Sequence, residues 1–339
     1  MAHNPPASEL LDLTDRMGFL VINESFDMWE RKKTPLDSHL IYPDWHEQDM
    51  RALVRRDRNH PSVIMWSTGN EGGEQYTDIA GAVIANRLHA ITKEEDPTRP
   101  TAASMNYAKP HMPLPAVMDT ITLNYQGEGI RNAPAYAHLQ GIRTSPLYPA
   151  FHAAFPDKII SSSENAAAIS SRGEYLFPVS DGISAPVADG FGGDPVRAHV
   201  SAYELYTAPF GSSADKVLGS LARHPFVAGG FVWSGWDYLG EPTPYYSARS
   251  SYFGVIDLAG SPRIASSSTK PTGASISPWS TSCPTGPGPN ASAKSHRSTS
   301  SRPETRPNSS SAGNLWTVVK RVNTNSACAG TMSPTSPVN

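Results

Sequence analysis

Short apolar runs that favour β-strands alternate with amphipathic stretches of helical period through residues 1–263, and this alternation limits the fold more than any other feature. The expected strands are Phe19–Asn23, Val63–Thr68, Thr101–Asn106, Thr120–Asn124, Lys158–Ser163 and Gly229–Trp233. The expected helices are Glu9–Met17, Asp44–Asp57, Ile79–Thr92, Val196–Tyr206 and Ser212–Leu221. Because helical crossovers join parallel strands, the pattern predicts an α/β fold with a parallel sheet and helices outside it.

The composition changes at Arg263. Of the 76 residues from Ile264 to Asn339, 37 are Ser, Thr or Pro, one is acidic and none is Phe or Tyr. Such a segment buries too little apolar surface to offset its ordering entropy. We therefore expect a globular domain at 1–263 and a low-complexity, disordered tail at 264–339. A frameshift is our further hypothesis for the tail, because the neighbouring reading frame can encode an aromatic segment typical of a barrel exit. Sequencing the DNA around codon 263 tests it.

Charge and cysteine content exclude several classes of function. The 339-residue chain has a net charge of −3 and no basic run, so neither nucleic acid nor a membrane surface is expected as a partner. It has no apolar run long enough for a membrane span and no signal peptide, which makes a cytoplasmic location the default expectation. Two cysteines and scattered histidines argue against a cysteine-rich zinc site and a metal-dependent hydrolase.

Acidic and polar residues follow several of the expected strands. Glu24, Glu71 and Glu164 each stand at such a strand end, as do Tyr125 and Trp233. In a (β/α)8 barrel the C-terminal strand ends line the active site, so Glu71 and Glu164 would converge in one pocket. Glycoside hydrolysis needs two carboxyl groups, one protonated and one ionised. The residues alone leave open that both are ordinary strand-end carboxylates.

A set of ordered motifs adds a family resemblance. The motifs are His3–Pro6, Gly18–Ile22, Asp57–Ile64, Trp66–Glu71, Glu164–Ala166, Ser170–Tyr175, Gly230–Trp233, Trp236–Tyr245 and Tyr252–Asp257. Together they resemble the catalytic barrel of glycoside hydrolase family 2, over about residues 2–263. Within that family the chain looks most like a β-galactosidase. The Asn-Glu pair after a strand, with Arg-Asn-His-Pro-Ser upstream, carries most of the specificity.

The resemblance implies roles for individual residues in a retaining hydrolase of β-galactosides. Glu71 would be the general acid/base and Glu164 the nucleophile. Asn70 would bond the sugar 2-hydroxyl, Tyr125 would donate to the nucleophile, and Trp233 would form the floor on which the sugar stacks.

The resemblance also implies peripheral contacts and a partner. His3 would contact sugar hydroxyls, and Glu24 and Glu241 would line the pocket. The expected partner is a carbohydrate, with no cofactor required. Some members use a magnesium or sodium ion, but we place no ligands for one. β-Glucuronidase and β-mannosidase remain alternative specificities, and the oligomeric state stays open.

The chain departs from the family in several respects, among them Asn165, which stands where the β-galactosidase subgroup often has Thr or Ser. Asn23 stands where the family usually has Asp. The match begins late in the second barrel strand, so we expect an incomplete (β/α)8 TIM barrel that lacks its first strands. Unpaired sheet edges would then expose core side chains. We therefore expect an intact local site with weak or absent activity in the isolated chain, and a non-catalytic or misfolded remnant is the competing interpretation.

Overall fold

The computed structural model describes residues 1–76, 79–126, 145–176, 185–187, 189–190, 192–203, 206–208 and 210–263. The chain divides into two units, Met1–Thr269 and Lys270–Asn339, and all described residues lie in the first. The tail expected at 264–339 lies outside the described residues, so its disorder and its frameshift origin stay predictions. Among the described helices, none has the length and apolar character needed to cross a bilayer.

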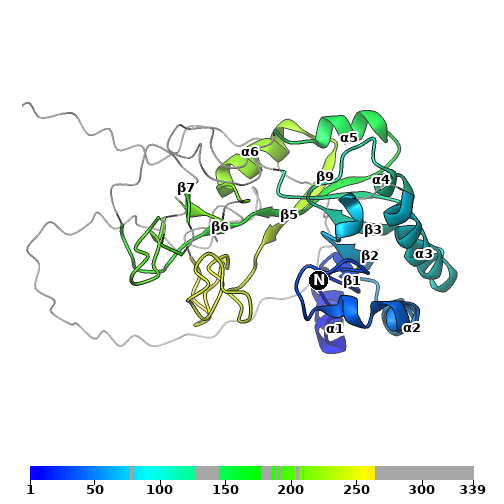
Figure 1. The fold of residues 1–339 in the computed structure, drawn as a ribbon, viewed down its shortest axis with the longest axis horizontal. Helices are drawn as coiled ribbons and strands as arrows, with labels where there is room; N and C mark the ends of the chain where they lie inside the picture. Colours follow the sequence, from blue (N-terminus) through cyan, green and yellow to red (C-terminus); the bar gives the residue numbers. More distant parts are fainter. Residues whose placement is uncertain are drawn as a thin grey trace, which may run out of the picture. The chain divides into compact units, whose positions relative to one another are not determined.

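Six parallel strands form one curled sheet, in the order β1-β2-β3-β4-β5-β9 (Figure 1). They are β1 (Val21–Glu24), β2 (Val63–Asn70), β3 (Thr101–Met105), β4 (Ile121–Asn124), β5 (Ile160–Ala166) and β9 (Val227–Trp233). All six expected strands are present, with small shifts at their ends. A closed (β/α)8 barrel has eight strands, so this half-barrel confirms the predicted incomplete barrel. A small second sheet has the order β6-β8-β7, formed by β6 (Ala168–Ile169), β7 (Ala185–Pro186) and β8 (Tyr206–Thr207).

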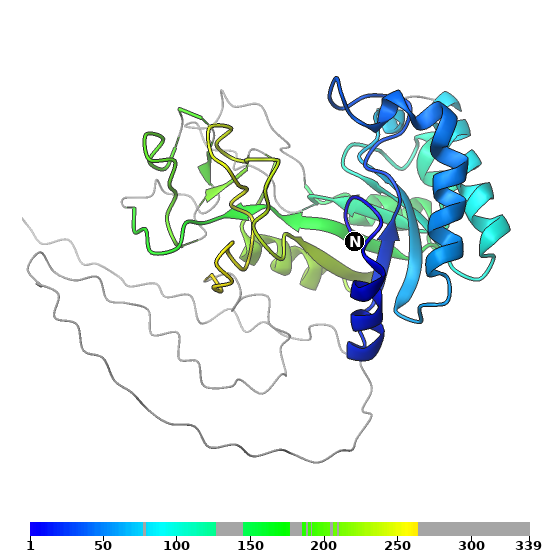
Figure 2. The same ribbon diagram turned by 90° about the horizontal axis from the view of Figure 1, so that it is seen from below.

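Helices pack on the outer side of the curled sheet. They are α1 (Ser8–Met17), η1 (Ser38–Leu40), α2 (Tyr42–Asp57), η2 (Gly73–Tyr76), α3 (Ile79–Glu95), α4 (Pro113–Val117), α5 (Tyr148–Ala154) and α6 (Ala214–Arg223). Helices α2 and α3 lie side by side (Figure 2). Large apolar side chains from both layers form a buried core, among them Leu11, Met50, Trp66, Ile121 and Phe151. This core fixes the strands whose ends carry the candidate site.

The prediction of a helix at Val196–Tyr206 is wrong, because the described residues of this range form turns and the start of β8. The Asp194 carboxylate accepts hydrogen bonds from the backbone N–H groups of Val196 and Arg197, at 3.1 and 3.0 Å. Asp194 and His199 also pair through their backbones in both directions. A side chain that satisfies nearby N–H groups in this way stabilises a turn against a helix. The other four expected helices are present.

Strand register brings the polar strand ends together at one edge of the sheet. Asn70 at the end of β2 lies opposite Ser104 of β3, and Asn124 at the end of β4 lies opposite Glu164 of β5. All five residues of β3 are buried, as expected for a parallel strand covered on both faces. Because all six strands run in the same direction, their C-terminal ends form a single polar edge.

Candidate active site

Asn70 and Glu71 stand where β2 ends. The backbone N–H of Glu71 donates to the Ser104 carbonyl at 2.8 Å, and Glu71 has a left-handed φ of 49°. Gly69 just before them lets the Trp29 indole approach closely, since a β-carbon at Gly69 would lie 2.4 Å from Trp29 Nε1. A non-glycine residue held in left-handed backbone costs free energy and is often found at functional sites.

Tyr125 and Glu164 meet at the ends of β4 and β5. The Tyr125 hydroxyl donates to Oε2 of Glu164 at 2.5 Å, and the Tyr125 N–H donates to the Glu164 carbonyl at 2.7 Å. Both side chains are buried, and Tyr125 also has a left-handed φ, of 55°. The contact predicted between Tyr125 and the candidate nucleophile is thus formed twice, through side chain and backbone.

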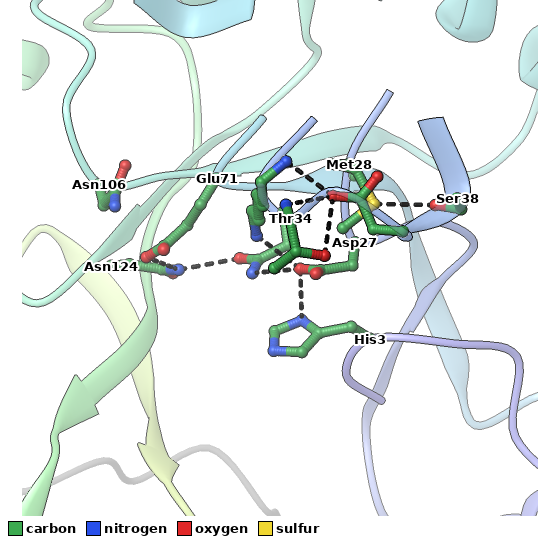
Figure 3. Close-up of polar contacts among 12 residues, drawn as sticks. His3, Asp27, Met28, Thr34, Ser38, Glu71, Asn106 and Asn124 are labelled. Atoms are coloured by element: carbon green, nitrogen blue, oxygen red, sulfur yellow. Dashed lines mark hydrogen bonds and ion pairs between the residues drawn. The ribbon is translucent and has the colours of Figure 1, made fainter. Parts of the chain in front are cut away.

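Asn124 joins the two halves of the site. Its Nδ2 amide donates to Oε1 of Glu71 and to Oδ1 of Asn70, both at 2.9 Å (Figure 3). Its Oδ1 accepts a hydrogen bond from the Ser163 hydroxyl at 2.6 Å. Sequence reasoning noted Asn124 only as the end of a strand and missed this bridging role. Because Tyr125 follows it directly, two consecutive residues hold Glu71 and Glu164.

His3, in the segment before α1, contacts two carboxylates and a tryptophan of the site. Its Nδ1 lies 2.9 Å from Oε1 of Glu24, and its Nε2 lies 3.7 Å from Oε1 of Glu164. The imidazole also stacks on the Trp233 indole, with ring centroids 4.9 Å apart. Burial of the ring opposes its charged form, but Glu24 and Glu164 outweigh burial and raise the pKa of His3. Ser67 donates to the second oxygen of Glu24 at 2.6 Å, which fixes that carboxylate.

Asp27 and Lys33 belong to the same cluster, although the sequence analysis did not select them. Oδ1 of Asp27 accepts hydrogen bonds from Lys33 Nζ at 2.6 Å and from Asn70 Nδ2 at 3.2 Å. It also lies 3.9 Å from Nδ1 of His3, toward which Asp27 points (Figure 3). Both residues lie in the loop after β1, where no strand-end signal marks them. The only hint was a second acidic residue three positions after Glu24.

Trp233 and Glu241 are connected through a third residue. Trp233 Nε1 donates to the Tyr238 hydroxyl at 3.0 Å, and that hydroxyl donates to Oε2 of Glu241 at 3.1 Å. Trp233 stands in the site beside His3, whereas Glu241 is exposed at the far end of this relay. The structure therefore brings Trp233, but not Glu241, to the carboxyl pair.

Both carboxyl groups of the pair have raised pKa values. Burial, followed by the charge of Glu71, raises the pKa of Glu164 to about 8. Burial also raises the pKa of Glu71, against the opposing effects of the Asn124 hydrogen bond and the Lys33 charge. When two carboxyl groups interact, their two successive proton losses belong to the pair rather than to either residue. The pair therefore keeps a proton well above the pH at which a free carboxyl loses it.

Asn23, the departure from the family pattern, lies outside this cluster. It is fully buried, and its Nδ2 amide donates to Oδ2 of Asp57 at 2.7 Å. Successive strand residues point to opposite faces, so Asn23 and Glu24 point apart. An amide can donate to the buried Asp57 carboxylate, which a second ionised carboxylate cannot. The Asp-to-Asn departure at Asn23 therefore does not change the charge of the candidate site.

One group of potential metal ligands occurs among the described residues, formed by Asp12, Asp15 and His60. Asp15 already accepts hydrogen bonds from the Ser62 N–H, and it lies 2.7 Å from His60 Nδ1. These contacts tie α1 to the turn before β2, at the N-terminal end of the strand. We interpret the group as a structural ion pair.

Comparisons with known proteins match this fold. Residues 1–142 match the family model for the TIM barrel domain of the glycosyl hydrolases of family 2. The β-galactosidase BoGH2A of Bacteroides ovatus is 37% identical over a 296-residue alignment that covers 77% of this chain and 32% of that protein. Human β-glucuronidase is 27% identical and covers 72% of this chain and 33% of that protein. A crystal structure of a β-glycosidase from Bacteroides vulgatus matches with a TM-score of 0.58 and 26% identity, covering 78% of this chain and 33% of that one.

The parallel half-barrel, with its polar groups at the C-terminal strand ends, is of the (β/α)8 class. Within that class the chain carries part of the TIM barrel domain of glycoside hydrolase family 2, as the sequence resemblance implied. The chain spans about a third of the length of the two curated relatives compared above.

Proposed function

We propose that these residues supply the catalytic pair of a retaining β-galactoside hydrolase, with Glu71 as general acid/base and Glu164 as nucleophile. One observation carries the proposal. Consecutive residues at the end of β4, Asn124 and Tyr125, hold the two carboxyl groups at the ends of β2 and β5, at 2.9 and 2.5 Å. The raised pKa values of both carboxyl groups support a shared buried site for the pair, and the division of roles follows the family resemblance.

Both chemical steps use this pair. In the first step, Glu71 gives its proton to the glycosidic oxygen while the Glu164 carboxylate attacks the anomeric carbon, so the glycosidic bond breaks and a galactosyl ester forms. In the second step, a water gives a proton to Glu71 and attacks the same carbon, which frees Glu164 and retains the anomeric configuration. The Tyr125 hydroxyl opposes the rise in the pKa of Glu164 and so favours the ionised form that the attack requires.

The charges around the pair favour a neutral sugar over a uronic acid. The Lys33 ammonium acts on Glu71 but is already paired with Asp27 at 2.6 Å. Glu24 adds a further negative charge beside His3. A uronate carboxylate would meet a mostly negative site without an unpaired cation among the described residues. This argues for the specificity of the β-galactosidase relative rather than that of the glucuronidase relatives.

A trapping experiment tests the roles. A 2-deoxy-2-fluoro-β-galactosyl fluoride slows both steps but has a leaving group that needs little acid catalysis, so the ester accumulates. We expect mass spectrometry to find the label on Glu164, and to find none in Glu164→Gln. Glu71→Gln should still be labelled, because fluoride leaves without a proton. Glu9→Gln, an exposed change on α1, is the matched control. Label on another residue, or preferential labelling by the mannosyl or glucuronyl analogue, would contradict the proposal.

A non-catalytic remnant is the second candidate. The outer edges of β1 and β9 have no strand partner within the described residues, which favours an incompletely formed substrate pocket. The remnant would show no label at any residue, and galactose would leave its unfolding temperature unchanged.

A further inference from the structure

The buried side chain of Asn70 is held at both ends of its amide. Its Nδ2 donates a hydrogen bond to Oδ1 of Asp27 at 3.2 Å, and its Oδ1 accepts one from Nδ2 of Asn124 at 2.9 Å. Figure 3 shows these contacts as a line of hydrogen bonds from Asn124 to Asp27. An amide has nearly the same shape in its two orientations, so its hydrogen-bond partners decide which one it takes.

Asn124 and Asp27 together allow only one orientation of this amide. The Asn124 carbonyl oxygen already accepts the Ser163 hydroxyl at 2.6 Å, so Asn124 offers its N–H groups to Asn70. The ionised Asp27 carboxylate offers only acceptor oxygens. A reversed Asn70 amide would place NH2 against NH2 and oxygen against oxygen, which loses both hydrogen bonds. The second Nδ2–H of Asn70, which has no hydrogen-bond partner among the described residues, is therefore held in a fixed direction.

The loop that carries Asp27 is anchored to the strand that carries Asn70. Trp29, two positions after Asp27, is buried, and its Nε1 donates to the Thr68 carbonyl of β2 at 2.7 Å. Oδ1 of Asp27 also accepts a hydrogen bond from Lys33 Nζ at 2.6 Å, which holds the carboxylate from another side. Supporting contacts of this kind keep a functional side chain in its productive geometry.

We propose that Asp27 is a positioning residue, which turns the amide of Asn70 so that its free N–H faces the 2-hydroxyl of the bound galactosyl unit. The proposal rests on the proposed function, because the sugar must be held at Glu71 and Glu164. Asn70 makes the contact with the sugar, and Asp27 acts through Asn70. Since contacts to the 2-hydroxyl strengthen in the transition state, loss of Asp27 should lower the rate of cleavage more than the binding of substrate.

A comparison of two substrates, with the full chain, tests this role. 2,4-Dinitrophenyl β-galactoside and its 2-deoxy analogue differ only in the 2-hydroxyl, and neither leaving group needs acid catalysis. The ratio of their kcat/KM values measures the contribution of the 2-hydroxyl, and damage to the fold lowers both values without changing the ratio. We expect Asp27→Ala to lower this ratio about tenfold and Asn70→Ala to lower it at least as far. The double variant should lower it no further than Asn70→Ala, because the two residues act as a unit.

Four further variants separate the orientation of the amide from charge and folding. Asp27→Leu keeps most of the side-chain volume without an acceptor, so it should lower the ratio equally and keeps the test valid if Asp27→Ala does not fold. Asp27→Asn keeps an acceptor oxygen and should restore most of the ratio. Lys33→Met removes the other partner of the same carboxylate oxygen and should keep the wild-type ratio. Asp49→Asn, exposed on α2, is the matched control and should keep both rates.

The outcomes distinguish this role from the proposed function. An unchanged ratio in Asp27→Ala and Asp27→Leu overturns the positioning role and leaves the proposed function standing. A ratio that falls equally in Lys33→Met also overturns it, because charge rather than the contact with the amide would then control the 2-hydroxyl. A wild-type chain that releases dinitrophenolate from neither substrate overturns both proposals.

Discussion

Replacing Glu71 by Gln should change how the stability of the chain depends on pH. The substitution keeps the shape of the side chain, and the new amide oxygen can still accept the hydrogen bond from Asn124 Nδ2 that Glu71 accepts at 2.9 Å. It removes the negative charge that, after burial, is the next largest contribution to the raised pKa of Glu164. The variant therefore isolates the electrostatic coupling between the two carboxyl groups.

The size of the effect follows from the titration of Glu164. Its pKa is about 8 in the folded chain, against the ordinary value of 4.5. Between these values the folded chain holds a proton that the unfolded chain has lost, so the free energy of unfolding falls as pH rises through this window. The full shift corresponds to about 5 kcal/mol at most. Glu71→Gln should lower the pKa of Glu164 by about one unit, which removes roughly 1 kcal/mol of this pH dependence.

Urea unfolding between pH 5 and pH 9 measures this dependence, and ¹³C NMR of labelled glutamate carboxyls follows Glu164 directly. The free energy of unfolding of the wild type should fall from pH 5 to pH 9. That of Glu71→Gln should fall less, and Glu164 should titrate at a lower pH in this variant. Glu9→Gln, exposed on the first turn of α1, should behave as wild type. The reasoning is refuted if Glu71→Gln and wild type give the same slope and the same Glu164 titration, since the carboxyls would then not share one environment.

Three further substitutions test other parts of the site. Tyr125→Phe removes the hydroxyl that donates to the Glu164 carboxylate; a hydrogen bond to a charged group contributes about 1.5–3 kcal/mol, so the pKa of Glu164 should rise by about one to two units in the same NMR titration. Lys33→Met removes a cation that lowers the pKa of Glu71, so that pKa should rise further; an unchanged titration would show that the Lys33 charge is screened. Gly69→Ala places a methyl group against the neighbouring indole and should destabilise the chain by about 1–3 kcal/mol in urea unfolding; a change below 0.5 kcal/mol would mean that the indole moves freely.

The sheet could be predicted from the sequence because each strand is a short apolar run between turn-forming residues. The helices were less predictable. Helices α4 and α5 span only five and seven residues and carry proline in their first turn, so they show too little periodicity to detect. The range Val196–Tyr206 has helical spacing, but Asp194 satisfies its first N–H groups and stabilises a turn. Local side-chain hydrogen bonds decided this segment, and periodicity does not report them.

The candidate site was predictable where a residue directly ends a strand, as Glu71 and Glu164 do. Asp27 and Lys33 escaped prediction because a loop, rather than a strand end, carries them, and only the fold brings that loop against Asn70. The substrate contact expected of Glu241 stays a prediction. This residue occurs in a motif that resembles the family, yet its side chain is exposed and reaches the site only through Tyr238.

Backbone conformation explains why neighbouring residues can serve one site. In a regular strand successive side chains point to opposite faces, so Asn70 and Glu71, or Asn124 and Tyr125, could not both face the same pocket. The left-handed φ values of Glu71 and Tyr125 break this alternation at the two strand ends. As a result Asn124 contacts Glu71 while Tyr125 contacts Glu164. These contacts join β2, β4 and β5, and β3 lies between β2 and β4 and pairs with both. The geometry of the carboxyl pair therefore depends on four strands and the two residues with left-handed backbone, whereas substrate binding also depends on the surrounding walls.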